Sequence, residues 1–204
     1  MKKEKNVKEE ILKKANQIFA KYGYEKTTMD DIAKAVGKKK GALYYYFRTK
    51  EDVFVEVIER EIIYLKEKLF QSIVDKKTTK EKLQTYVLNR YKILNEVANF
   101  YQTFKEDYYR QFEFVQKLRK KFDIEEEKFI EDILKDGVKK GELKDIDVSL
   151  TAESFVVAMK GFEYRWTSEI DFNYVEKVIQ SMLEIFFYGI SKGVKSGKIS
   201  IKKQ

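Results

Sequence analysis

Residues 27–54, TTMDDIAKAVGKKKGALYYYFRTKEDVF, decide the fold of the N-terminal part of this chain. Thr28 and Asp31 have the spacing of a capping box, so a short helix should begin directly after Thr28. Gly37 should end that helix after about two turns, because glycine readily adopts the left-handed conformation of a helix C-terminus. A second short helix follows, and another capping box at Thr49 predicts the start of a longer one.

Two short helices joined by a glycine turn predict a helix-turn-helix, whose second helix enters the major groove of DNA by its N-terminal end. This second helix should cover roughly residues 39–45, with Leu43 and Phe47 directed inward. Small residues near its start allow a close approach to base edges, and lysines there reach phosphates or guanine. We expect base contacts from Lys39, Lys40, Gly41 and Ala42, and phosphate contacts from Thr28, Tyr44, Tyr45 and Lys50.

The positive charge is concentrated in the first quarter of the chain. Residues 1–50 contain 14 lysines and arginines against 6 acidic residues, whereas residues 51–204 contain 28 of each. A lysine-rich genome raises the lysine count but does not concentrate the imbalance. A localised basic surface favours a polyanionic partner, most simply nucleic acid.

Composition excludes several classes of function. The 204 residues are 43% hydrophobic and include no proline, which predicts an all-α fold with a real core. Cysteine and histidine are both absent, which removes disulfides, thiolate and imidazole metal sites and the usual nucleophile pairs. We therefore expect no enzyme, no cofactor and no metal site. Without a membrane-length apolar run or a signal segment, a soluble cytoplasmic protein with no membrane partner is expected.

Apolar residues at helical spacing predict helices over the rest of the chain. The helix that begins at Lys50 is long enough to link two domains, and Thr79 is a plausible cap for the next one. The break after Gly23 should end the first helix. The expected helices cover about residues 7–22, 50–74, 83–101, 124–140, 150–166 and 172–190.

Residues 100–114 are unusually aromatic, and three rings form a stripe at a spacing of four residues. Such a stripe is either filled core or the lining of a cavity. A cavity of this kind would be mostly apolar, which suggests a lipophilic ligand such as a fatty acyl chain or an aromatic drug. Its expected lining is Tyr101, Phe104, Tyr108, Phe112, Phe155, Met159, Phe162 and Trp166.

Residues 27–54 resemble the DNA-binding signature of the TetR family of bacterial transcription regulators. One position departs from the family pattern. The residue after Gly37 is usually apolar and packs under the turn, but here it is Lys38, which either snorkels outward or changes that packing. The matching positions are Thr28, Asp31, Ile32, Ala33, Gly37, Gly41, Ala42, Leu43, Tyr44, Tyr45, Phe47, Lys50, Glu51 and Phe54.

The resemblance implies an N-terminal three-helix helix-turn-helix domain, residues 1–49, and a larger helical ligand-binding and dimerisation domain, residues 50–204. It implies a homodimeric repressor that binds a double-stranded DNA operator and is released by a small lipophilic effector. The alternative is a DNA-bound regulator or DNA-organising protein that acts through a protein partner without an inducer. In the family the last two helices usually form the dimer interface, expected here at Phe172, Val175, Ile179, Met182 and Phe186.

Overall fold

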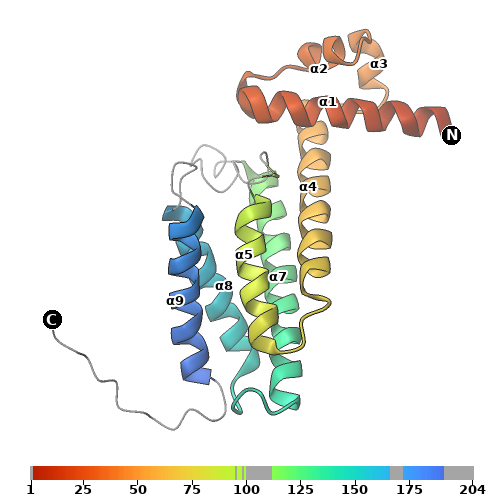
Figure 1. Cartoon of the computed structure of the whole chain (residues 1–204). Coiled ribbons are helices and arrows are strands. Elements are labelled where there is room, and N and C mark those ends of the chain that lie inside the picture. Colours follow the sequence, from red (N-terminus) through yellow and green to blue (C-terminus); the bar gives the residue numbers. More distant parts are fainter. Residues whose placement is uncertain (1, 95, 98, 100–111, 166–171, 191–204) are drawn as a thin grey trace. The chain divides into compact units, whose positions relative to one another are not determined.

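The computed structural model describes residues 2–94, 96–97, 99, 112–165 and 172–190, and each element within these ranges is an α-helix (Figure 1). The description of side chains leaves out residues 2–5, 162–165, 172 and 190. The predicted all-α fold is confirmed. The helices are α1 (Lys2–Lys26), α2 (Met29–Ala35), α3 (Lys40–Tyr44), α4 (Lys50–Ile73), α5 (Thr79–Leu94), α7 (Glu113–Lys139), α8 (Val148–Arg165) and α9 (Phe172–Ile190).

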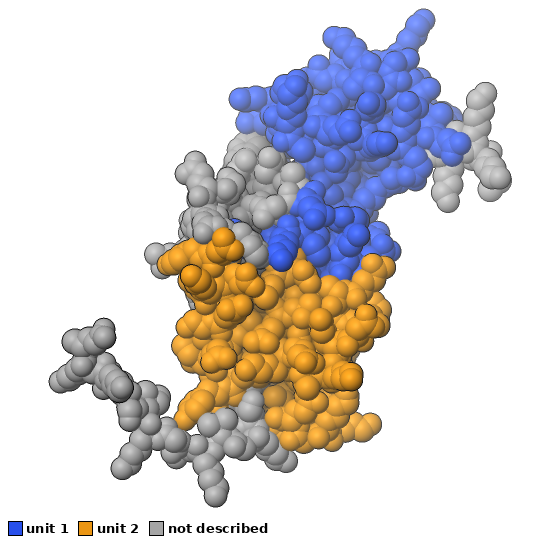
Figure 2. Space-filling view, in the orientation of Figure 1, with its two compact units in different colours: residues 1–69, 90–123 blue, residues 70–89, 124–204 orange. Residues whose placement is uncertain are grey.

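The chain packs into two compact units (Figure 2). Unit 1 comprises residues 1–69 and 90–123, and unit 2 comprises residues 70–89 and 124–204. Helices α4, α5 and α7 therefore each contribute residues to both units. The predicted domains, residues 1–49 and 50–204, are assigned by expected function, whereas the two units are defined by packing. The domain assignment stays a prediction.

The start and end of α2 follow from local sequence. Thr28 and Asp31 form the predicted capping box, with the Asp31 carboxylate accepting the Thr28 N–H at 2.9 Å. At the other end, Gly37 has a φ of +66°, and the Lys38 N–H donates to the Ala33 carbonyl at 2.9 Å. This is a Schellman motif, which satisfies carbonyls that the helix leaves open.

Two other predicted boundaries near the N-terminus, at Gly23 and Thr49, are confirmed as well. Gly23 interrupts α1 with a φ of 80° and a ψ of 162°. Thr49 and Asp52 form a second reciprocal pair at the start of α4, with N–H to oxygen distances of 2.9 and 3.0 Å. Leu43 and Phe47 are buried, as expected. The three-helix arrangement of α1, α2 and α3 thus follows the sequence prediction.

A buried polar contact joins α1 to α4 within unit 1. The side-chain amides of Asn16 and Asn99 donate to the same Glu61 carboxylate oxygen, at 2.7 and 2.9 Å. The Asn99 amide also donates to the Asn16 carbonyl at 3.2 Å. Because Glu61 and Asn99 are buried, these bonds offset the cost of removing polar groups from water.

Three helices differ from their predicted extents, and α1 begins at Lys2 rather than near residue 7. Helix α5 ends at Leu94 rather than near residue 101, because the chain turns there and the Glu96 N–H donates to the Ile93 carbonyl at 2.8 Å. Helix α7 begins at Glu113 instead of near residue 124. The added length carries its own buried stripe at helical spacing, formed by Val115, Leu118 and Phe122.

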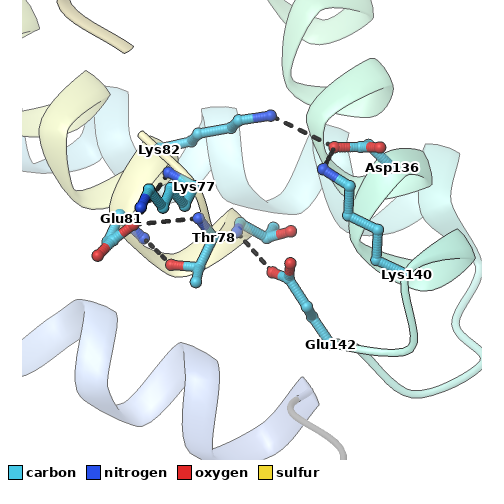
Figure 3. Close-up of polar contacts among 8 residues, drawn as sticks. Lys77, Thr78, Glu81, Lys82, Asp136, Lys140 and Glu142 are labelled. Atoms are coloured by element: carbon cyan, nitrogen blue, oxygen red, sulfur yellow. Dashed lines mark hydrogen bonds and ion pairs between the residues drawn. The ribbon is translucent and has the colours of Figure 1, made fainter. Parts of the chain in front are cut away.

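Helix α5 is capped by Thr78, so the prediction of Thr79 as its cap is wrong. The Glu81 N–H donates to the Thr78 hydroxyl at 3.2 Å, and the Thr78 N–H donates to the Glu81 carboxylate at 3.1 Å (Figure 3). Thr79 is buried instead, and its N–H donates to the Glu142 carboxylate at 2.6 Å. At the start of α8, the Asp147 carboxylate accepts the Leu150 N–H at 3.0 Å.

Candidate DNA-binding surface

Helix α3 has one buried side and one exposed side. Leu43 points into the core of unit 1, and Phe47, just after the helix, covers the same side. Tyr45 is 72% exposed and Tyr44 44% exposed. The predicted base-contacting residues and two predicted phosphate contacts are all exposed to solvent: Lys39, Lys40, Gly41, Ala42, Tyr44 and Tyr45. We call these six residues the α3 surface.

Gly41 of the α3 surface stands in open space. A Cβ atom built on Gly41 would have no heavy atom outside its immediate chain neighbourhood within 4 Å. Its φ is not positive, so an alanine would fit the backbone. The space around Gly41 would therefore accept a side chain, and the absence of one leaves the backbone open to close approach by another molecule.

Lys40 of the α3 surface is paired with Asp30 of α2, at 3.0 Å between the ammonium and the carboxylate. This hydrogen bond raises the pKa of Lys40, so its side chain stays charged. Both side chains are about half exposed. Pairs exposed to this degree contribute little to stability, so a phosphate or a base edge can replace Asp30 at small cost.

Two other residues of the helix-turn-helix, Thr28 and Lys38, already make hydrogen bonds within the chain. The Thr28 hydroxyl donates to the Asp31 carboxylate at 2.6 Å and accepts the Asp31 N–H at 3.2 Å. The Lys38 backbone closes the Schellman motif, and its side chain is half-buried rather than extended into solvent. The predicted phosphate contact of Thr28 remains a prediction.

The ammonium of Lys50 makes contacts with Tyr24 and Glu25 that its position in the sequence does not indicate. Its ammonium donates to the carbonyls of Tyr24 and Glu25, at 2.7 and 3.3 Å, and stands 4.2 Å from the centre of the Tyr24 ring. Burial lowers the pKa of Lys50, and the nearby charge of Glu25 opposes that effect. Tyr24 was not singled out from the sequence, because no local pattern links it to a residue so far along the chain.

The predicted ligand-pocket residues fall into three groups. Phe112 belongs to unit 1, where its ring centre lies 5.5 Å from that of Tyr24. Phe155 and Met159 are buried in unit 2. Outside the described residues or side chains lie Tyr101, Phe104, Tyr108, Phe162 and Trp166. A common pocket for these residues stays a prediction.

The predicted dimer residues of α9 occupy different sides of the helix. Val175 and Ile179 are buried within unit 2. Met182 and Phe186 are partly exposed, and they line an open recess together with Ile185, which is 74% exposed. Phe172 begins α9, but its side chain lies outside the description. An interface on α9 would therefore use the exposed side, while Val175 and Ile179 hold the helix in place.

Two further findings concern the described part of the chain only. Its acidic side chains form no group of three or more that is placed to hold a metal ion. Its helices include none with the length and apolar character needed to cross a membrane.

Comparison with known proteins places this surface in a family. Residues 11–57 match the family model described as bacterial regulatory proteins, tetR family. The chain is 30% identical over 190 residues to the HTH-type transcriptional regulator QacR of Staphylococcus aureus, covering 92% of this chain and 100% of that protein. It is 29% identical over 192 residues to the HTH-type transcriptional repressor KstR2 of Mycolicibacterium smegmatis, covering 91% of each.

A solved structure shares the fold at lower identity. AibR, in complex with isovaleryl coenzyme A and operator DNA, has a TM-score of 0.64 and 18% identity, covering 89% of this chain and 98% of that one. The similarity to QacR extends over nearly the whole chain, and the matched family segment contains the complete helix-turn-helix. This chain belongs to the TetR family of bacterial transcription regulators.

Proposed function

We propose that this protein is a homodimeric repressor that binds a pseudo-palindromic DNA operator and is released from it by a lipophilic small molecule. The observation that carries the proposal is the α3 surface: a basic, tyrosine-bearing face with an open glycine at its centre. Basic side chains supply phosphate affinity, and small residues let the backbone approach base edges.

The roles within the α3 surface follow from side-chain chemistry. Lys39, Lys40, Gly41 and Ala42 face the bases, where a lysine bonds guanine O6 or N7 and a methyl group contacts thymine. The hydroxyls of Tyr44 and Tyr45 donate to phosphate oxygens. Thr28 and Lys50 complete the phosphate contacts at the starts of α2 and α4, where a helix N-terminus favours an anion.

A homodimer explains the exposed apolar side of α9. Ile185 is largely open to solvent, and Met182 and Phe186 beside it are partly exposed. Pairing this side with a second copy removes apolar area from water. Two copies of α3 then read half-sites on one face of the duplex, spaced about 34 Å apart or a multiple of that distance.

The effector acts by population shift. A ligand that binds better to a conformation with poor DNA affinity must weaken DNA binding, and DNA must weaken ligand binding by the same factor. The complex of AibR with isovaleryl coenzyme A and operator DNA supports a ligand with an acyl chain. The apolar character of Phe155 and Met159 supports a lipophilic one.

Binding selection from random duplexes tests the DNA-binding part of this function. The parent should return a two-fold symmetric sequence. Ala42→Ser should return an altered sequence, because residue 42 is placed against base edges. An identical selected sequence from Ala42→Ser would show that residue 42 does not read bases.

A thermal-shift screen tests the effector. Fatty acids, acyl-CoAs and aromatic cations serve as probes, and a binding compound should raise the unfolding temperature and weaken binding to the selected operator. If the protein binds the selected operator but no probe changes the unfolding temperature or the operator affinity, the alternative of a regulator that works through a protein partner is favoured.

A further inference from the structure

We propose that Tyr24 positions Lys50 for its DNA phosphate, and that Phe112 and Phe114 at the start of α7 control operator affinity by holding the Tyr24 ring. This regulatory role rests on the function proposed above, in which Lys50 contacts a phosphate. It adds a specific path by which the packing at the start of α7 reaches the DNA-binding residues.

Tyr24 lies at the centre of a cluster of aromatic rings within unit 1. The helix break at Gly23 turns the chain just before Tyr24, so its ring leaves the path of α1 and meets residues from α4 and from the start of α7. Among the described residues, four rings have their centres close to that of Tyr24: Phe54 at 4.8 Å, Phe112 at 5.5 Å, Phe114 at 5.8 Å and Phe19 at 6.0 Å.

The same residue fixes the ammonium of Lys50. Carbonyl oxygens of Tyr24 and Glu25 accept two of the three ammonium hydrogens, and the ring of Tyr24 lies 4.2 Å away. An ammonium held by a ring face and two carbonyls has a defined direction for its remaining hydrogen. A side chain that is already ordered loses less entropy when it binds a phosphate.

The rings of Phe112 and Phe114 connect this arrangement to α7. They lie on either side of Glu113, the first residue of α7, and their ring centres are 5.5 Å apart. Phe114 also contacts Phe54, one turn after Lys50 in α4, with 6.1 Å between ring centres. A displacement at the start of α7 therefore moves the Tyr24 ring, and with it the ammonium of Lys50.

The chain supplies a matched control on the same helix. Lys21 stands over the ring of Tyr22 with 5.0 Å between its ammonium and the ring centre, which is also a cation–π pair. Tyr22 is 53% exposed. Tyr22→Leu removes the ring of a second cation–π pair without touching Lys50, so it tests whether the loss of any such pair has the same effect on binding.

The experiment measures binding to a mixed-sequence duplex over a salt series, because a phosphate contact does not depend on base sequence. Tyr24→Leu should bind about three- to tenfold more weakly, with a salt slope that is shallower by up to about one. Tyr22→Leu and the ring-preserving Tyr24→Phe should bind like the parent. Thermal unfolding of each variant monitors folding.

A double-mutant cycle tests the path from α7. Phe114→Ala should weaken binding by about two- to threefold in the parent, and should have no effect once Lys50→Gln has removed the charge. An equal loss in both backgrounds, tighter binding by Tyr24→Leu, or the same behaviour of the two leucine variants would overturn the proposal. If Tyr24→Leu fails to fold, the double-mutant cycle still tests the proposal. Phe114→Leu can replace Phe114→Ala in that cycle as the milder substitution.

Failure of the proposed function has a different signature. In that case the parent itself shows no salt-dependent binding to the selected or the mixed-sequence duplex. A parent that binds, with a shallower slope in Lys50→Gln but parent-like binding in Tyr24→Leu, would leave the DNA-binding function intact and remove only the role of Tyr24.

Discussion

Gly41 in α3 and Gly137 in α7 are both helical glycines, and they stand in opposite surroundings. A Cβ atom on Gly41 would meet nothing within 4 Å. On Gly137 it would overlap the Thr79 hydroxyl and lie 3.0 Å from a methyl carbon of Leu143. Glycine costs stability inside any helix, so each needs a reason. For Gly137 the reason is within the chain, and for Gly41 the proposed function places it in the DNA that approaches α3.

The region around Gly137 is built to hold two helices together. We call it the α5–α7 junction, and it connects the start of α5 to the end of α7 within unit 2 (Figure 3). A second Schellman motif ends α7, since Gly141 has a φ of +73° and the Glu142 N–H donates to the Gly137 carbonyl at 3.0 Å. Its polar contacts join Thr79 to Glu142 at 2.6 Å, Lys82 to Asp136 at 3.3 Å and Lys140 to Asp136 at 2.6 Å.

The largest expected effect is therefore at the α5–α7 junction. Gly137→Ala forces the buried Thr79 side chain to move, and overpacking of this kind costs about 1–3 kcal/mol, less a gain of up to about 1 kcal/mol from helix propensity. Chemical denaturation should show a net loss of unfolding free energy.

The double variant Gly137→Ala with Thr79→Ala removes the overlapping hydroxyl and methyl groups. It should regain most of the loss when compared with Thr79→Ala alone. DNA affinity measured under conditions where the variant is folded should equal that of the parent. An unchanged stability of Gly137→Ala would mean that Thr79 moves aside freely, and the contrast between the two glycines would weaken.

Gly41→Ala should show the reverse pattern. With open space around the new methyl group and a helical backbone, unfolding free energy should stay the same or rise by up to about 1 kcal/mol. Affinity for the selected operator should fall by about tenfold, because the methyl group stands between the helix backbone and the base edges. Operator affinity and unfolding free energy are measured on the same preparation. Parent-like affinity would place Gly41 outside the DNA contact.

The sequence predicted well what depends on a few neighbouring residues. The capping boxes at Thr28 and Thr49 and the glycine turn at Gly37 each involve groups within about one helical turn, so the pattern and the contact coincide. The choice between Thr78 and Thr79 also had a local signal. Only Thr78 has a glutamate three residues later, which makes it the capping residue.

Contacts between distant residues were not predictable in the same way. Lys50 and Tyr24 are 26 residues apart, and no periodicity in the sequence indicates that the Lys50 ammonium donates to the Tyr24 carbonyl. The overlap between Gly137 and Thr79 likewise depends on how α5 and α7 pack. The exposed face of α3 could be predicted because Leu43 and Phe47 fix its buried side. The environment of Lys50 could not, because it is set by tertiary structure.

The smallest expected effect is the loss of stability in acid that comes from two helix caps, one in the helix-turn-helix and one in the α5–α7 junction. The Thr28 hydroxyl and N–H lower the pKa of Asp31, and the N–H groups of Thr78 and Lys77, with the Thr78 hydroxyl, lower the pKa of Glu81. Each pKa is lower in the folded than in the unfolded chain. Each contribution to stability is therefore complete above the unfolded-state pKa and is lost as the pH falls through the folded-state pKa.

Urea midpoints measured between about pH 6 and pH 3 test this dependence. The parent should lose stability toward the acidic end, and Asp31→Asn and Glu81→Gln should each lose less over the same range because the titrating group is gone. The amides still offer an oxygen to the helix N-terminus, so both variants should remain folded near neutral pH. A variant that keeps the full acid dependence of the parent would show that its cap does not stabilise the helix through charge. If only one of the two variants keeps the full acid dependence, then charge stabilises the cap in one region and not in the other. The helix-turn-helix and the α5–α7 junction would then differ in their caps as well as in the surroundings of their glycines.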